Sequence, residues 1–381
     1  MDKIRTIQVI PLIRRLDRVF SGSTYQIVSR NTIYARIETE GGIIGEAFGG
    51  DEDIHQQKVV QIANDCLAPR LIGAGIWPVE PLWRRMFDTP DLPLHNRGIH
   101  TLDMINHAIL MQAIAIIDMA IWDAVGKSLG KPLWQLLGGF RSRVPVVGIG
   151  GYYKPGALDE LGEEIQLCID LGLAGIKLKV GKASVDEDIR RVEYIRKHFA
   201  ESFVVACDAN QAWTFEQAHR FAQGVADLNL EWLEEPVRWY DQLEGLKRLR
   251  NSTAIPLVAG QGEISKWGCR DLVLGGCVDT LNVDATIAAG ITEWMRIASF
   301  AETMDINMGH HEEPQVALHM LAAIPNSTYV EIFHQKERDP MWYELVEDLP
   351  LIADGFMYPN EGPGLGWHYN AEVIDRYGQP A

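Results

Sequence analysis

The sequence predicts an α/β barrel that follows a smaller α+β domain. At 381 residues the chain exceeds the usual size of a single domain. From about residue 144, short β-rich runs alternate with helical stretches at intervals of about 25 to 35 residues, the rhythm of βα units in a parallel sheet. Eight such strands close a barrel. The eight runs are VPVVGIGG, GIKLKV, FVVACDAN, LEWLEEP, IPLVAGQ, VDTLNVD, INMGHH and TYVEIF.

The chain before the barrel predicts strands and then helices. Residues 4 to 49 are β-rich, with a hairpin that turns at Glu40-Gly41-Gly42. The glycines there fit neither a P-loop nor a dinucleotide-binding fingerprint. From Ile54 to Gly130, apolar residues recur at three- and four-residue spacing, which is typical of helices. We therefore expect a capping domain over residues 1–135, a barrel over 136–345, and a C-terminal segment over 346–381 that packs back on the first domain.

Composition argues against several classes of function. The formal net charge is -17, and a surface of this sign attracts neither nucleic acid nor an anionic membrane. The most apolar stretch, residues 108 to 125, is interrupted by Gln112, Asp118 and Asp123, which favours a buried helix over a membrane span. Five cysteines without a CxxC pair, and no secretory signal pattern, predict reduced thiols and a cytoplasmic location.

Reactive side chains stand at the ends of the predicted barrel strands. In a βα barrel, catalytic groups gather at the carboxyl ends of the strands. Nearly every predicted strand ends in such a group. These are Lys177 and Lys179, Asp208 and Asn210, Glu234 and Glu235, Asp284, His310 and His311, and Glu331.

Lys177 and Lys179 lie two residues apart, so they share one face of a strand. Two buried ammonium groups side by side lower each other's pKa, which makes a lysine a usable general base near neutral pH. Solvated surface lysines are the alternative interpretation. The apolar run around the pair, AGIKLKV, argues against it.

Asp208 and Glu234 end adjacent predicted strands and are hard oxygen ligands of the kind that Mg²⁺ takes. Both could instead be salt-bridge partners of the lysines. His311, at a strand tip, suits proton transfer, and Asp284 could hold its imidazole in one tautomer and raise its basicity. A zinc site is the weaker interpretation, because HHEEP lacks the HExxH spacing. His310 could be a structural neighbour.

Taken in order, the motifs resemble the mandelate racemase group of the enolase superfamily, whose sites use a Lys or His base with Mg²⁺. The resemblance spans nearly the whole chain. It implies a modified TIM barrel, (β/α)₇β, covered by an N-terminal α+β capping domain, and a homo-oligomer. It rests on AIIDMAIWDAVGKSLGKPLWQLLGG, the Lys-x-Lys of GIKLKVG, CDANQAW, WLEEP, the Asp of NVDATIAAG and the His of MGHH.

The resemblance also implies roles for the strand-end residues. Lys179 is the base on one face of the substrate, and His311 with Asp284 acts on the other face. Lys177 neutralises the substrate carboxylate, Asp208 and Glu234 bind Mg²⁺, and Glu331 is a hydrogen-bond donor or electrostatic partner to the enediolate oxygen.

One position departs from the family pattern. The third metal ligand is usually the Glu of a Gly-Glu pair, five residues after the Pro that opens the fifth strand. Counting from Pro256 reaches Gln261. Either the amide oxygen of Gln261 binds the metal, which leaves the site one negative charge poorer, or Glu263 reaches in from two residues on. The register favours Gln261 slightly.

These residues predict abstraction of the proton α to the carboxylate of a small-molecule substrate. Reprotonation would give a racemase or epimerase of a 2-hydroxy acid, and departure of a β-hydroxyl would give a dehydratase. Because relatives with both Lys-x-Lys and a His-Asp dyad are mostly acid-sugar dehydratases, we expect a hydro-lyase that converts an aldonate or aldarate to a 2-keto-3-deoxy acid. Expected contacts to the substrate are Tyr25, His95, Arg97 and Asn210.

Two rival classes stay open at this point. A Schiff-base aldolase would use Lys177 or Lys179 covalently and would need no metal. A non-catalytic scaffold would keep the barrel without needing a ring of polar strand ends.

Overall fold

The first domain contains a three-stranded antiparallel sheet. The computed structural model describes residues 2–50, 54–88, 104–153 and 157–379. The sheet consists of β1 (Ile4–Ser21), β2 (Gln26–Thr39) and β3 (Ile44–Gly49), in that order. At the predicted hairpin, the Thr39 amide donates to the Ile43 carbonyl (3.0 Å) and Gly42 has a φ of 85°, which favours a residue without a Cβ. The strands predicted over residues 4 to 49 are therefore confirmed.

Helices complete this domain, as the apolar spacing predicted. The longest, α4, contacts β2 and β3 and also the barrel helix α11 (Gly290–Thr303). Its segment His107–Leu129 is long and apolar enough to cross a membrane, but 83% of the most apolar window is buried inside the structure. This burial makes α4 a core helix of the fold. The helical segments are α1 (Gln56–Gln61), η1 (Ile62–Leu67), α2 (Ala68–Leu71), α3 (Val79–Phe87), α4 (Met104–Leu129) and α5 (Leu133–Leu136).

The predicted barrel is confirmed. Its parallel strands follow the hydrogen-bonded order β10-β9-β8-β7-β6-β5-β4-β11. The ring closes just before β11, where the Met308 amide donates to the Asn326 carbonyl (2.8 Å) and the Thr328 amide to the Met308 carbonyl (2.9 Å). The strands are β4 (Val144–Gly150), β5 (Gly175–Lys179), β6 (Val204–Asp208), β7 (Leu233–Glu234), β8 (Leu257–Ala259), β9 (Thr280–Asn282), β10 (Asn307–Gly309) and β11 (Val330–Ile332).

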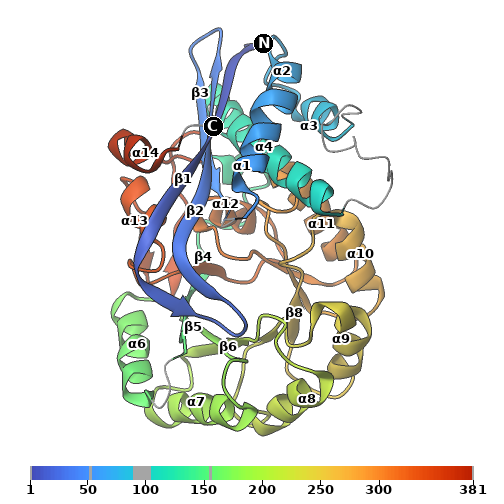
Figure 1. Cartoon of the computed structure of the whole chain (residues 1–381), viewed down its shortest axis with the longest axis vertical. Helices are drawn as coiled ribbons and strands as arrows, with labels where there is room; N and C mark the ends of the chain where they lie inside the picture. Colours follow the sequence, from blue (N-terminus) through green and yellow to red (C-terminus); the bar gives the residue numbers. More distant parts are fainter. Residues whose placement is uncertain (1, 51–53, 89–103, 154–156, 380–381) are drawn as a thin grey trace.

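One helix follows each strand from β4 to β10, so the barrel has the (β/α)₇β form that the resemblance implied (Figure 1). Local capping signals position several of these helices. The hydroxyl of Ser184 accepts from the Glu187 amide before α7, Thr214 and Gln217 form a capping box at α8, and Pro314 is the first residue of α12. The helices are α6 (Leu158–Asp170), α7 (Val185–His198), α8 (Phe215–Gly224), α9 (Gln242–Arg250) with the short η3 (Trp239–Asp241) before it, α10 (Lys266–Leu274), α11 and α12 (Pro314–Ala323).

The chain after the barrel touches both parts of the fold. Its elements are α13 (Pro340–Leu345), β12 (Ile352–Ala353), β13 (Phe356–Met357) and α14 (Ala371–Tyr377). β13 pairs antiparallel with β4, with Phe356 opposite Pro145. α14 contacts β1, and the Gln379 amide donates to the Pro11 carbonyl (3.0 Å).

The hairpin between β1 and β2 reaches over the end of the barrel where β5 and β6 finish (Figure 1). Its tip bonds to the barrel twice. The Tyr153 amide donates to the Ser21 carbonyl (3.2 Å), and the Tyr25 hydroxyl donates to Asn210 Oδ1 (3.1 Å). The hairpin therefore covers the carboxyl ends of these strands, where the reactive residues lie.

Candidate active site

The strand-end residues of β5, β6 and β7 lie side by side. In the parallel register Lys179 pairs with Asp208, and Asp208 pairs with Glu234. Lys177, Asp208 and Glu234 are fully buried, and Lys179 and Glu331 are nearly so. The barrel register thus brings lysines and carboxylates together at one buried end of the sheet.

Lys177 is held by two carboxylates. Its Nζ lies 2.8 Å from Glu234 Oε1 and 2.6 Å from Glu331 Oε1, and Asp208 Oδ2 is 3.9 Å away. Burial acts to lower the pKa of Lys177, but attraction to Glu234, Glu331 and Asp208 outweighs burial and raises it. The lysine is therefore held as a positive charge between these carboxylates.

Lys179 has one close carboxylate partner among the residues that the structure describes, Asp208, whose Oδ2 accepts from Nζ at 2.7 Å. Burial again opposes the charge, but attraction to Asp208, with smaller contributions from other nearby groups, outweighs burial and raises the pKa of Lys179 well above its usual value. The predicted mutual repulsion is present, because Lys179 lowers the pKa of Lys177, but the net lowering of the lysine pKa values that the sequence predicted is not found. Each lysine has a carboxylate at hydrogen-bonding distance, and their mutual repulsion is the weaker effect.

Asn210 links Asp208 to the hairpin. Its amide N–H donates to Asp208 Oδ1 (2.8 Å) and its Nδ2 to Asp208 Oδ2 (3.1 Å), while its Oδ1 accepts from Tyr25. Burial raises the pKa of Tyr25, so its hydroxyl stays a donor. The structure thus places two of the predicted substrate contacts, Tyr25 and Asn210, beside the cluster of strand-end lysines and carboxylates, which we call the ring. The other two, His95 and Arg97, lie outside the described residues.

His311 stands between two carboxylates. Its Nδ1 lies 3.3 Å from Asp284 Oδ2, and its Nε2 lies 3.4 Å from Glu312 Oε1. Thr286 fixes Asp284 by donating to Oδ1 from its amide (2.8 Å) and its hydroxyl (2.7 Å). Burial alone would lower the pKa of His311, but attraction to Glu312 and the hydrogen bond with Asp284 raise it to about 9. At neutral pH the side chain is therefore a positively charged imidazolium, protonated on both ring nitrogens.

His310 is fully buried and supports the loop after β10. Its Nε2 accepts from the Ala285 amide (3.0 Å), and its Nδ1 faces the carbonyls of His311 (3.0 Å) and Glu312 (3.2 Å). These bonds require the neutral tautomer with the proton on Nδ1. Burial lowers the pKa of His310, which agrees with a neutral ring.

The two candidates for the third metal ligand differ clearly in their surroundings. Gln261 Oε1 is buried and has no hydrogen-bond partner among the described residues. Glu263 instead packs against Gly268 and lines a surface cavity with Trp239 and Asp271. Burial, then repulsion from Glu235 and Asp271, raises its pKa to about 7. An orphaned buried oxygen fits a cation ligand better than a carboxylate that faces α10.

The donor set fits a hard cation. Asp208, Glu234 and the Gln261 amide supply oxygen atoms from three neighbouring strand ends, as Mg²⁺ requires. Within the described part of the chain, no three His, Cys, Asp or Glu side chains converge as a metal site. The amide oxygen of Gln261 is thus the group that could complete the set.

Sequence reasoning missed several residues that complete the site. Asn282 donates to Glu234 Oε1 (3.1 Å) and Glu331 Oε1 (3.4 Å), and its position two residues before Asp284, on the same strand face, is a signal that could have identified it. Trp232 Nε1 donates to Glu234 Oε2 (3.0 Å). Tyr152, which follows β4, interacts electrostatically with Lys179 and accepts from Arg338 (3.0 Å).

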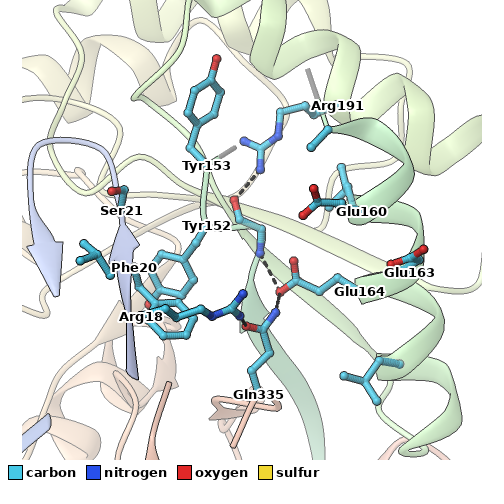
Figure 2. A pocket seen from close by; sticks show the side chains of 15 residues that line it. Arg18, Phe20, Ser21, Tyr152, Tyr153, Glu160, Glu163, Glu164, Arg191 and Gln335 are labelled. Atoms are coloured by element: carbon cyan, nitrogen blue, oxygen red, sulfur yellow. Dashed lines mark hydrogen bonds between the residues drawn. The ribbon is translucent and has the colours of Figure 1, made fainter. Parts of the chain in front are cut away.

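A cavity of about 310 Å³ opens beside the ring, between the end of β1 and α6 (Figure 2). Glu164 accepts there from the Gly151 amide (3.1 Å) and from Gln335 Nε2 (2.6 Å). Arg191 donates to the carbonyls of Gly151 (2.5 Å) and Lys179 (2.8 Å). None of the strand-end lysines and carboxylates described above lines this cavity. Its residues support the end of β5 from outside the ring.

Comparison with known proteins agrees with the fold. The family described as mandelate racemase / muconate lactonizing enzyme, N-terminal domain, matches residues 20–138, and the enolase C-terminal domain-like family matches residues 160–373. Arabinonate dehydratase of Saccharolobus solfataricus is 29% identical over 354 residues, covering 91% of this chain and 90% of that protein. L-talarate/galactarate dehydratase of Salmonella typhimurium is 33% identical over 350 residues, covering 92% and 83%.

Solved structures match over the full length. The crystal structure of a mandelate racemase/muconate lactonizing enzyme from a marine actinobacterium, in complex with magnesium, has a TM-score of 0.89 and 36% identity and covers 100% of both chains. This protein therefore belongs to the mandelate racemase/muconate lactonizing enzyme group of the enolase superfamily, as its motifs predicted.

Proposed function

We propose that this protein abstracts the proton α to a carboxylate in a Mg²⁺-dependent reaction and completes it by dehydrating an acid sugar to a 2-keto-3-deoxy acid. The observation that carries the proposal is a continuous network between two proton-transfer groups. Lys179 is bonded to Asp208, which lies beside Lys177, and Lys177 pairs with Glu331. Glu331 Oε2 in turn accepts from the amide of Glu312, whose side chain contacts His311.

The metal would be held by Asp208, Glu234 and Gln261, with Glu263 as the less favoured third ligand. Mg²⁺, when bound, would neutralise part of the charge of Asp208 and Glu234, which pair with the lysines, and would polarise the substrate carboxylate. Such polarisation lowers the barrier to proton abstraction by roughly several kcal/mol. The α-proton of a carboxylate is too weakly acidic for a base acting alone. A cationic site is therefore a requirement of the chemistry.

The residues of the chain divide the proton transfers. Lys179, as the free amine, takes the α-proton from one face. Lys177 stays an ammonium because Glu331, which is not among the metal ligands, pairs with its Nζ at 2.6 Å, so it stabilises the negative charge that develops on the carboxylate oxygens. Tyr25 and Asn210 lie beside Lys179 and would bind a substrate hydroxyl.

His311 supplies the second proton. It is protonated at neutral pH, so it acts as an acid toward the β-hydroxyl, which leaves as water while the C–O bond breaks. The resulting enol then tautomerises to the 2-keto-3-deoxy acid, because it gains a proton at the β-carbon and loses the proton on its enol oxygen. Two similar proteins, named for the dehydration of arabinonate and of talarate and galactarate, support an acid sugar as the substrate.

A racemase or epimerase of a 2-hydroxy acid is the second candidate. The protonated state of His311 also suits the return of a proton to the α-carbon from the opposite face. The two reactions share their first half, so product analysis is needed to separate them.

Five free cysteines, four of them buried, agree with a reducing, cytoplasmic setting for either reaction.

The test is a screen of the purified protein with Mg²⁺ against a stereochemically complete set of aldonates and aldarates, with detection of the 2-keto product. We expect a keto product from at least one acid, and its loss on addition of EDTA. Epimerised substrate without keto product would support the second candidate. Activity that survives EDTA and is trapped by borohydride would contradict both and favour a Schiff-base aldolase.

A further inference from the structure

Glu312 places a carboxylate beside His311, and the proposed mechanism assigns it no contact with the substrate. Its Oε1 lies 3.4 Å from His311 Nε2. Its charge also acts on Lys179 and on the hydroxyls of Tyr25 and Tyr152. A carboxylate that interacts with both Lys179 and His311 lies beside the position that the proposed mechanism gives the α-carbon, between these two groups. The rest of the substrate must therefore pass close to it.

The backbone holds this side chain in place. Glu312 and Glu313 have φ values of 52° and 49°, in the left-handed region that residues with a Cβ rarely adopt. The Glu312 amide donates to Glu331 Oε2 (3.0 Å), and its carbonyl lies 3.2 Å from His310 Nδ1. The side chain of Glu313 turns to Arg30, 2.8 Å away. The unfavourable conformation is thus fixed by bonds on both sides, and it directs Glu312 toward His311.

The carboxylate of Glu312 has room for further hydrogen bonds. A carboxylate offers about four acceptor positions. Among the described residues, His311 Nε2 is the one group within ion-pair distance of it. The side chain keeps 8% of its surface exposed. A hydroxyl of a bound polyol could therefore donate to it.

The same charge would repel a second carboxylate on the substrate. Repulsion between like charges is strong at a site as buried as this one, where water screens little. We propose that Glu312 accepts a hydrogen bond from a hydroxyl of an acid sugar with a single carboxylate and excludes diacids, which makes the substrate an aldonate and not an aldarate. This inference rests on the proposed function for the identity of the substrate, but its effect on binding does not require turnover.

The test compares affinities for two unreactive analogues in the presence of Mg²⁺, measured by calorimetry. One is an aldonohydroxamate and the other is the corresponding analogue with a distal carboxylate. We expect the wild-type protein to bind the first at least about tenfold more tightly, and Glu312→Gln to reduce this preference by about tenfold or more, within the range that one specific polar contact supplies. Glu216→Gln, on the exposed surface of α8, is the matched control and should leave the preference unchanged.

Two further measurements keep the outcome clear. Glu312→Asp retains the charge and should keep most of the exclusion of the diacid, so it separates charge from a loss of folding in the Gln variant. A wild-type preference for the diacid analogue, or an unchanged preference in Glu312→Gln, would overturn the inference. Production of keto acid from any sugar acid is scored separately, because failure there contradicts the proposed function and leaves the binding comparison valid.

Discussion

Arg30 joins the first domain to the barrel through ion pairs that are almost completely buried. From β2 it reaches Glu313 (2.8 Å) after β10 and Asp339 (3.0 Å) before α13, and the three side chains are 1%, 1% and 5% exposed. Arg30→Met would leave two carboxylates facing each other without their shared cation. Removing one partner of a buried pair costs about 3–5 kcal/mol, so we expect the free energy of unfolding to fall by about that amount.

The pH dependence of this loss has a definite sign. Burial raises the pKa of Glu313 to about 7 even with Arg30 beside it, and removal of Arg30 would raise it further. A carboxyl group whose folded pKa lies above its unfolded value favours the folded state at low pH and loses that contribution as pH rises through the folded pKa. The deficit of Arg30→Met relative to wild type should therefore be larger at pH 8 than at pH 6.

The assay is urea unfolding followed by tryptophan fluorescence at both pH values. Arg220→Met is the matched control, because Arg220 and its partner Asp186 are 64% and 56% exposed, and loss of such a surface pair costs less than about 1 kcal/mol. Arg30→Met/Glu313→Gln should recover about 1–3 kcal/mol relative to the sum of the single changes. A single Arg30→Met variant within 1 kcal/mol of wild type, roughly the cost of a surface pair, would refute the reasoning.

Three other predictions concern the site itself. Gln261→Ala should weaken Mg²⁺ binding by about tenfold and Gln261→Glu should strengthen it, whereas Glu263→Gln should change it by less than about twofold. Calorimetric titration with Mg²⁺ measures these affinities. A larger loss of affinity in Glu263→Gln than in Gln261→Ala would make Glu263 the ligand. Asp284→Asn should lower the pKa of His311 from about 9, because it removes an anionic hydrogen-bond partner, and an NMR titration of the imidazole that shows no downward shift would contradict the described pair. Tyr25→Phe removes the bond to Asn210 and should raise KM several-fold with a small change in kcat, consistent with about 1 kcal/mol for one neutral hydrogen bond; equal KM values would exclude Tyr25 from substrate binding.

The positions of the strand-end residues could be predicted from local patterns. Lys177 and Lys179 are two residues apart on a strand, and Asp208 and Glu234 end the next two βα units. Strand periodicity and the repeat of the barrel are enough to bring such residues to one end of a parallel sheet. The fold and the positions of most of the strand-end lysines and carboxylates could therefore be predicted from local sequence.

Long-range pairing could not be predicted in this way. Arg30 and Glu313 are separated by 283 positions, and no local pattern indicates that they meet. The left-handed backbone at Glu312 depends on bonds to Glu331 and His310, so its side chain could not be placed beside His311 from sequence. The prediction that the net pKa shift of both lysines is downward was wrong for the same reason. The direction of the shift depends on which carboxylates lie within hydrogen-bonding distance.

The central claim is that Lys179 and His311 act on opposite faces of the α-carbon in a Mg²⁺-dependent reaction. The most direct test is the exchange of the α-proton with D₂O, followed by NMR, for the best acid sugar found in the screen. We expect His311→Asn to exchange the α-proton of this substrate with little dehydration. Lys179→Met should lose exchange of the α-proton. Exchange and dehydration by the wild-type protein should both require Mg²⁺. Dehydration by Lys179→Met at the wild-type rate, or exchange that persists without Mg²⁺, would contradict the account.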